Sequence, residues 1–195
     1  MTEGLRLYFL SFYAVGVAVL VFNVLSASVP SEQVEKRPED VRRYLPAVLI
    51  PLTWLLPPLV ILLRIGEPQV EWNGLRLLGF LLSLYAAVML LWAPASLGRF
   101  LVPRAVVFRD HALVTAGPYR LVRHPIYSGV LALWLGAALA TVNLVLLFLW
   151  PIALIGVSIQ ARVEEGLLHS KFGAAYENYS RRTRRFLPRF GGGSQ

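Results

Sequence analysis

Residues 123–165 read RHPIYSGVLALWLGAALATVNLVLLFLWPIALIGVSIQARVEE, and this stretch decides the fold. It holds two apolar runs, at residues 125–141 and 144–161, which are separated only by Val142 and Asn143. A helix needs roughly 17–25 apolar residues to cross the hydrocarbon core of a bilayer, and both runs reach that length. Because the connection is so short, the runs are predicted to form a tight antiparallel helical hairpin. The polar residues at the two ends of the stretch should therefore meet at one face of a membrane.

Three further apolar runs precede this hairpin, at residues 5–28, 44–63 and 75–93, and the third is expected to stop at Pro94. The first run lacks a basic lead-in and is longer than the apolar part of a secretory signal, so we expect a retained helix. Hydrophobic residues make up 56% of the chain and charged residues only 15%, whereas a soluble domain carries about 25% charged residues. The sequence thus predicts an all-α, polytopic membrane helix bundle of about five transmembrane helices.

The positive charge is concentrated in the two segments that the hairpin brings to one side. Residues 94–124 hold five arginines and one acid, and residues 161–195 hold six arginines and one lysine against three glutamates. Each segment thus carries +4, and together they account for the formal net charge of +8. By the positive-inside rule, the C-terminal region is predicted to be cytoplasmic and the N-terminus to lie on the opposite side.

The bilayer itself explains the basic flanks, and no aromatic platform accompanies them, so nucleic acid is not expected as a partner. A membrane orientation signal and contact with anionic headgroups are one interpretation of the C-terminal arginines. These are Arg181, Arg182, Arg184 and Arg185.

His124 is the most informative polar residue at the start of the hairpin. Pro125 can occupy the first turn of a helix, where its missing N–H leaves no hydrogen bond unmade. His124 would then lie at the helix N-terminus, beside free backbone N–H groups that favour a carboxylate or phosphate. An ordinary interfacial helix cap is the alternative. No metal is expected, because the chain has no cysteine and no other ligand stands at metal-binding spacing from His124.

Glu164 and Glu165 follow the second apolar run, where the negative end of a helix dipole disfavours two acids. The pair therefore needs a cationic partner, which Arg120, Arg123 or Arg162 could supply. One interpretation is a salt-bridged interface. The other is that a carboxylate holds an amino or hydroxyl group of a cofactor.

Taken in order, these motifs resemble the isoprenylcysteine carboxyl methyltransferase family and its relatives, the phospholipid methyltransferases. The signature begins as His111-x-Leu113-Val114-Thr115-x-Gly117-Pro118-Tyr119 and continues as Arg123-His124-Pro125-x-Tyr127-x-Gly129. After the hairpin come Glu164-Glu165-x-x-Leu168, then Phe172-Gly173-x-x-Tyr176-x-x-Tyr179, and finally Leu187-Pro188. The resemblance covers about residues 97–190.

The resemblance implies methyl transfer from S-adenosylmethionine to a lipophilic substrate, with the lipid bilayer as the other partner. It divides the chain into residues 1–93, which form a transmembrane scaffold and substrate cavity, residues 94–190, which form the methyltransferase region, and a flexible tail, 191–195. It also implies a set of cofactor-binding residues at the polar end. These are His111, Ala112, Leu113, Val114, Tyr119, His124, Pro125, Ile126, Tyr127 and Glu164.

Gln160 departs from the family pattern, because the carboxyl-methylating enzymes usually carry an arginine there, four residues before the first glutamate. A glutamine cannot supply the charge-assisted fork that an arginine offers a carboxylate. The methyl acceptor therefore stays open between an isoprenylcysteine-type carboxylate, a phospholipid amine and another lipophile. We expect Gln160 and Arg123 to contact the substrate, and Glu165 and Arg162 to act in catalysis, with Glu165 or His124 as the base for an amine.

Two other kinds of protein fit the same layout. Membrane reductases resembling sterol reductases have a related C-terminal arrangement but use NADPH. A membrane component without enzymatic activity would use the loops only for packing and capping.

Overall fold

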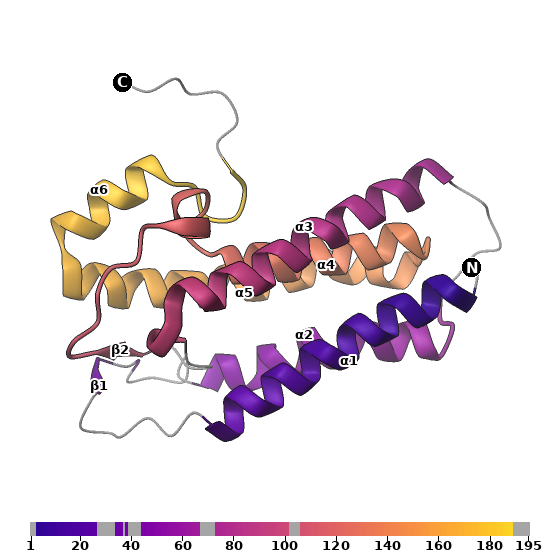
Figure 1. Ribbon diagram of the computed structural model, residues 1–195, viewed down its shortest axis with the longest axis horizontal. Coiled ribbons are helices and arrows are strands. Elements are labelled where there is room, and N and C mark those ends of the chain that lie inside the picture. Colours follow the sequence, from indigo (N-terminus) through magenta and orange to yellow (C-terminus); the bar gives the residue numbers. More distant parts are fainter. Residues whose placement is uncertain are drawn as a thin grey trace.

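The computed structural model describes residues 3–26, 34–36, 38, 44–66, 73–101 and 106–188. Within these residues the chain is mostly helical, and its long helices run side by side along the longest axis of the molecule (Figure 1). The α-helices are α1 (Glu3–Ser26), α2 (Leu45–Leu62), α3 (Asn73–Leu97), α4 (Pro125–Ala140), α5 (Leu144–Phe172) and α6 (Ala174–Arg182). The short elements are the antiparallel strands β1 (Val34–Lys36) and β2 (Val107–Phe108) and the 3-10 helices η3 (Gly98–Phe100) and η4 (Gly117–Arg120).

The predicted hairpin between α4 and α5 is confirmed, and one side chain fixes its turn. Val142 adopts a positive φ of 50°, which turns the chain back within a single step. Asn143 then caps α5, because its side chain accepts a hydrogen bond from Leu146 N at 3.0 Å. The Asn143 amide also donates to Ile65 O at 2.8 Å, so the turn is tied to the end of α2.

Small residues allow α3 and α4 to pack against each other in what we call the α3–α4 seam: Gly79 and Ser83 of α3 against Gly136 and Ala140 of α4. A Cβ atom on Gly79 would lie 2.4 Å from Ala140 N, and one on Gly136 would lie 2.8 Å from Gly79 O. Such close backbone approach is typical of helices that associate in lipid, where small residues replace the hydrophobic effect as the basis of contact.

Two predicted helix ends are wrong. Helix α3 was expected to stop at Pro94, but it continues to Leu97. Gly98, with a φ of 53°, then changes the direction of the chain. A proline removes one N–H donor and strains the preceding turn, yet it does not prevent one more turn after it. Likewise, α5 does not stop at residue 161 but continues to Phe172. Charged residues end an apolar run without ending a helix, and Gly173, with a φ of 52°, is the actual terminator.

By length and hydropathy, α3 and α5 could each cross a membrane, whereas the apolar parts of α1, α2 and α4 are shorter. Large apolar side chains on their outer faces are exposed, among them Leu91 at 76% and Phe148 at 78%. A soluble protein rarely leaves so much apolar helix surface open to water. At 1.5 Å per residue, α5 is longer than the roughly 30 Å hydrocarbon core, so its charged C-terminal part projects beyond the apolar segment.

The N-terminus of α1 and the junction of α5 with α6, which follows the glutamate pair, lie at opposite ends of the bundle (Figure 1). Glu3 accepts a hydrogen bond from Arg64 at 2.7 Å, beside the Ile65–Asn143 contact at the hairpin turn. The end of α5 that precedes α6 lies at the other end of the bundle (Figure 1). This relative placement is the one expected for an odd number of membrane spans, and the cytoplasmic side stays a prediction. The tail predicted to be flexible, 191–195, lies outside the described residues.

Candidate active site

The segment before α4 and the segment after α6 are joined through their backbones. Arg123 N donates to Arg184 O at 2.8 Å, and His124 N donates to Arg185 O at 3.1 Å. Val122 and Arg184 form an isolated parallel bridge at the same place. The chain after α6 therefore returns to lie directly beside the residues that begin α4.

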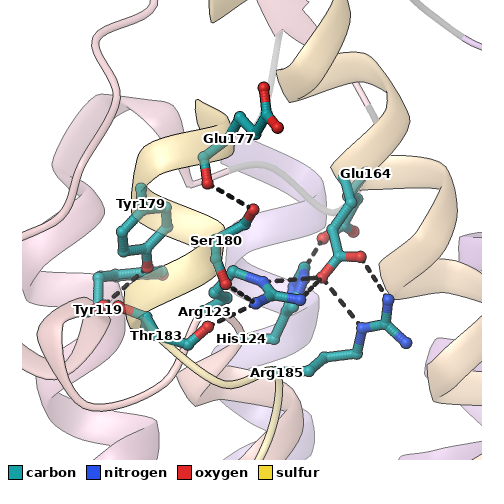
Figure 2. Close-up of polar contacts among 10 residues, drawn as sticks. Tyr119, Arg123, His124, Glu164, Glu177, Tyr179, Ser180, Thr183 and Arg185 are labelled. Carbon is teal, nitrogen blue, oxygen red and sulfur yellow. Dashed lines mark hydrogen bonds and ion pairs between the residues drawn. The ribbon is translucent and has the colours of Figure 1, made fainter. Parts of the chain in front are cut away.

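Arg123 holds this junction together from its side chain (Figure 2). Its Nε and Nη2 donate to Glu165 Oε1 at 3.1 and 3.0 Å. Its Nη1 donates to the backbone carbonyls of Ser180 and Thr183 at 2.8 and 2.5 Å. One guanidinium thus links α5 to the C-terminal end of α6.

Glu165 is the anion at the centre of what we call the polar cluster, which comprises Arg123, His124, Glu164, Glu165 and Arg185. Arg185 donates to both Glu165 oxygens, at 3.0 and 2.5 Å, and His124 Nε2 lies 3.2 Å from Oε1. Burial alone would raise the pKa of Glu165, but hydrogen bonds from His124 and Arg185 and the charge of Arg123 hold that pKa well below its usual range. Glu165 is therefore ionised and fully engaged at neutral pH.

His124 lies between the two glutamates and is 7% exposed. Its Nδ1 is 3.5 Å from Glu164 Oε2, on the side opposite its contact with Glu165. Burial alone would lower the pKa of His124, but the hydrogen bonds and charges of Glu164 and Glu165 outweigh it and raise that pKa above the ordinary value. As predicted, His124 is the residue that precedes the first turn of α4, with Pro125 at the start of the helix.

Glu164 takes its remaining contacts from the two helices of the hairpin. The Tyr127 hydroxyl of α4 donates a short hydrogen bond to Glu164 Oε1, and Gln160 Nε2 donates to the same oxygen at 3.1 Å. Gln160 is one turn before Glu164 on α5, so the two side chains share a helix face. The Glu164 side chain keeps 27% of its surface exposed.

A small cavity of about 60 Å³ opens beside the polar cluster. Six of its lining residues were predicted to bind cofactor or substrate: His111, Leu113, Val114, Tyr119, Arg123 and His124. Four others complete it: Leu97, Leu168, Tyr176 and Tyr179. Leu168, Tyr176 and Tyr179 belong to the signature but were not assigned a binding role from the sequence, and nothing in the sequence singles out Leu97.

Two polar atoms in the cavity wall are buried without a hydrogen-bond partner among the described residues, His111 Nδ1 and Tyr176 Oη. The His111 ring stacks on Phe100, with 4.5 Å between ring centroids. Burial, and then the charge of Lys171, lower the pKa of His111, so its ring is neutral at neutral pH. Tyr179 donates to Tyr119 O at 2.7 Å, and burial raises the pKa of Tyr179 to about 12, so this donor keeps its proton.

The other predicted site residues lie around the cavity rather than in its wall. Ala112 is exposed in the loop after β2, and Ile126 is half-buried in the first turn of α4. Arg162 is exposed on α5, away from the contacts of the polar cluster, and its catalytic role stays a prediction.

Arg185 is the functional candidate that the sequence did not reveal. It stands in an arginine-rich run for which headgroup contact was one interpretation, yet its guanidinium pairs with Glu165. Of the three arginines considered as partners of the glutamates, Arg123 is the one that makes this contact. No local pattern distinguishes Arg185 from Arg184, because the choice depends on how the chain after α6 returns to α4.

Comparison with protein families identifies the chain. The model of the phospholipid methyltransferase family matches residues 75–175, which is more than half of the chain. The chain therefore belongs to the phospholipid methyltransferase family, whose members use S-adenosylmethionine as the methyl donor. The match begins in the first turn of α3 and runs past α5, so it contains the α3–α4 seam as well as most of the polar cluster.

A curated relative extends this comparison. The chain is 37% identical over 81 residues to the Protein-S-isoprenylcysteine O-methyltransferase of Schizosaccharomyces pombe, strain 972. The aligned part is 41% of this chain and 34% of that protein. The chain thus matches about a third of the length of this relative. Of the kinds of protein compatible with the sequence, the comparisons support the methyltransferase.

Proposed function

We propose that this chain is an integral membrane methyltransferase that transfers a methyl group from S-adenosylmethionine to a lipophilic acceptor. The observation that carries the proposal is the polar cluster, in which both halves of the family signature meet at one end of an apolar helix bundle. The family match at residues 75–175 supports the same activity. The bundle supplies contact with lipid, and the cluster supplies contact with a water-soluble donor.

The proposal includes five membrane spans formed by α1 to α5, with the polar cluster on the cytoplasmic side. The opposite placement of Glu3 and the cluster supports an odd number of spans, and the basic segments support the orientation. Residues 1–93 would form the scaffold and substrate cavity, and residues 94–190 the methyltransferase region. Through the α3–α4 seam, α3 packs against α4, which belongs to the methyltransferase region.

The residues of the cavity fit S-adenosylmethionine in chemical kind. Leu113, Val114 and Leu168 offer apolar walls for an adenine ring, while His111 Nδ1 and Tyr176 Oη are buried polar atoms that lack a partner. A buried unpaired polar atom costs roughly 1–3 kcal/mol, so a ligand that supplies the partner binds more tightly. The cavity volume of about 60 Å³ is below the roughly 300 Å³ of a typical ligand site, so we expect S-adenosylmethionine to extend beyond the cavity or its walls to move apart on binding.

His124, Glu164 and Tyr127 are the polar groups that we expect to hold the donor at the edge of this cavity, with Pro125 and Ile126 shaping the first turn of α4 behind them. S-adenosylmethionine, when bound, supplies an electrophilic methyl group on a cationic sulfur. The chain's own contribution is alignment and exclusion of water, which can lower a barrier by several kcal/mol. The lowered pKa of Glu165 makes its carboxylate a weaker base, and the raised pKa of His124 keeps its ring protonated to a higher pH than an ordinary histidine.

The comparisons indicate two alternative kinds of methyl acceptor. The family name indicates a phospholipid, and the name of the S. pombe relative indicates an isoprenylcysteine carboxyl group. Both are lipids with a polar reacting end, which suits a site at the edge of a bilayer.

The test is incubation of the purified protein with labelled S-adenosylmethionine and a total lipid extract, followed by mass analysis of the lipids that gain a methyl group. We expect lipid-soluble label that depends on the protein. Thermal shift with S-adenosylhomocysteine, and in parallel with NADPH, provides a second measurement. Stabilisation by NADPH alone would assign the chain to the reductases, and a response to neither compound would favour a component without activity.

Variants connect the activity to the cluster. His124→Ala and Glu164→Gln should each weaken S-adenosylhomocysteine binding about tenfold, which corresponds to about 1.4 kcal/mol. His169→Ala and Glu177→Gln make the same chemical changes at exposed positions outside the cavity wall and serve as matched controls. Near-wild-type affinity in both cluster variants would refute their assignment to the binding site.

A further inference from the structure

Lys171, in the last turn of α5, directs its ammonium group toward other parts of the protein rather than into water. Its side chain is only 12% exposed. Its Nζ donates to Glu35 Oε2 at 2.5 Å, to Phe108 O at 2.6 Å and to Arg109 O at 2.7 Å. An ammonium group has three N–H donors, so these contacts use all of them. We call the four residues joined in this way the loop latch.

The loop latch holds a turn that leads into the cavity wall. Phe108 ends β2, and its carbonyl oxygen also accepts a hydrogen bond from His111 N at 3.2 Å. The His111 ring packs on Phe108, with 5.9 Å between ring centroids, and edge-on against Phe172, with 6.0 Å. Phe172 directly follows Lys171, so the end of α5 supports both the backbone and the ring of His111. His111 itself lines the cavity.

Glu35 brings the segment between α1 and α2 to the latch. It lies in β1, which pairs with Val107 and Phe108 of β2 (Figure 1). Two strands this short are barely stable on their own, so the bonds that Lys171 makes to both of them strengthen the pairing. β1 lies outside residues 75–175, which the family model matches. The latch therefore connects the N-terminal part of the chain to the cavity.

Lys171 also acts on His111 through its charge. Burial, and then the charge of Lys171, lower the pKa of His111, while the charge of Asp110 acts in the opposite direction. A neutral imidazole can accept a hydrogen bond at Nδ1, which is the atom that lies buried without a partner among the described residues. The cation thus favours the form of the ring that can receive a donor from a ligand.

A lysine near the end of a helix commonly stabilises the helix itself, through the helix dipole and the last carbonyl groups. The hydrogen bonds of Lys171 indicate a different role. All three go to residues outside α5, and two of them go to the backbone of the loop that enters the cavity wall. What Lys171 fixes is therefore the position of that loop relative to α5.

We propose that Lys171 is a positioning residue for the methyl donor, which with Glu35 holds the turn from Phe108 to His111 in the shape that binds S-adenosylmethionine. This inference rests on the proposed function. Neither side chain of the ion pair lines the cavity, so neither needs to touch the donor. A wall that is already held in place loses less conformational freedom on binding, and this gain appears as affinity.

The first experiment measures the affinity of the purified full chain for S-adenosylhomocysteine by isothermal titration. Lys171→Met keeps an unbranched side chain but removes the three donors, and we expect the affinity to fall about tenfold. Lys171→Arg can still donate to part of the latch and should recover most of the loss. Arg181→Met breaks an exposed ion pair with Glu177 on α6, outside the cavity wall, and is the matched control.

Kinetics separate positioning of the loop from general support of the fold. In Lys171→Met, KM for S-adenosylmethionine should rise about tenfold while kcat at saturating donor stays near the wild-type value. A residue that only stabilises α5 would instead lower the Tm and the amount of active protein without raising KM. That outcome would overturn the proposal.

A second variant tests the part played by β1. Glu35→Gln weakens the hold on Lys171 and should lower the affinity for S-adenosylhomocysteine about threefold. The double variant with Lys171→Met should bind no more weakly than Lys171→Met alone, because Glu35 acts through Lys171. Additive losses would contradict this coupling. Glu3→Gln, in the exposed ion pair with Arg64 at the far end of the bundle, is the control.

The wild type distinguishes failure of this inference from failure of the proposed function. If the wild type does not bind S-adenosylhomocysteine, both are wrong. If it binds, and Lys171→Met binds equally well, the positioning role alone is wrong. Tighter binding by Lys171→Met would mean that the latch holds the cavity closed, which also overturns the proposal. Should Lys171→Met not fold, Glu35→Gln carries the test, and an unchanged affinity in that variant refutes the role of the latch.

Discussion

The α3–α4 seam and the polar cluster each bring separate segments close together, but by opposite means. In the seam, Gly79 and Gly136 let two backbones touch because they lack side chains. In the cluster, Glu165 holds Arg123, His124 and Arg185 through long side chains whose charges compensate each other. The seam fixes where α4 runs, and the cluster fixes what gathers at its first turn. The position of α4 and the chemistry at its first turn are therefore determined by different residues.

The largest effect should come from adding volume to the seam. In Gly79→Ala the new Cβ would lie 2.4 Å from Ala140 N, and backbone cannot give way as a side chain can. We expect the free energy of unfolding to fall by about 3 kcal/mol, the upper range for overpacking. Chemical denaturation in detergent measures it. Gly74→Ala on the same helix, where a Cβ meets nothing within 4 Å, is the matched control.

A second, smaller effect should follow from removing the central charge of the cluster. Glu165→Gln leaves Arg123 and Arg185 facing a neutral amide. Breaking a fully buried ion pair costs about 3–5 kcal/mol, and partial exposure reduces this to about 2 kcal/mol here, because the Arg185 side chain is 31% exposed. Denaturation measures the loss, and Glu177→Gln on the surface of α6 is its control. If both variants are equally stable, Glu165 is free for catalysis rather than a structural anion.

The fold could be predicted well from sequence because the information that determines it is local. Apolar runs and one two-residue turn located all five long helices, and Pro125 located the start of α4. The predicted ends of α3 at Pro94 and of α5 at residue 161 were wrong. A proline and the charged residues that follow residue 161 were taken as helix ends. Both mark changes in the environment of a helix, whereas Gly98 and Gly173 mark changes of backbone direction.

The site was predictable only in part, for a physical reason. Ordered motifs pointed to His124 and the glutamate pair, since each motif lies within one segment. Arg185 could not be distinguished from its neighbours, because its partner is 20 residues away and the contact forms only after α6 turns back. The orientation of the Gln160 amide could not be predicted either, because the spacing of residues does not say which of its two polar atoms faces Glu164.

A third effect compares two arginines that the sequence does not distinguish. Arg185→Ala removes two hydrogen bonds to Glu165 and should lower the free energy of unfolding by about 1 kcal/mol, because this side chain is partly solvated. Arg184→Ala should have no measurable effect, since the part of Arg184 that joins the segments is its backbone carbonyl. Parallel denaturation curves test the difference. Equal losses would mean that general charge rather than pairing supports the tail.

The smallest effect we expect is a dependence of stability on pH that originates in His124. Its folded-state pKa is raised above the ordinary value of 6.5 by the hydrogen bonds and charges of Glu164 and Glu165, which outweigh burial. The stabilisation by the charged ring is therefore fully present below about pH 6.5 and is lost as pH rises through the raised pKa.

The Tm of the wild type should fall over that range relative to His124→Ala, while His169→Ala should follow the wild type. The seam carries no titrating group among its four residues, so Gly79→Ala should shift Tm without changing this pH profile. A wild-type Tm that rises or stays level relative to His124→Ala would mean that the ring is neutral in the folded protein, and the polar cluster would then hold together through its arginines alone.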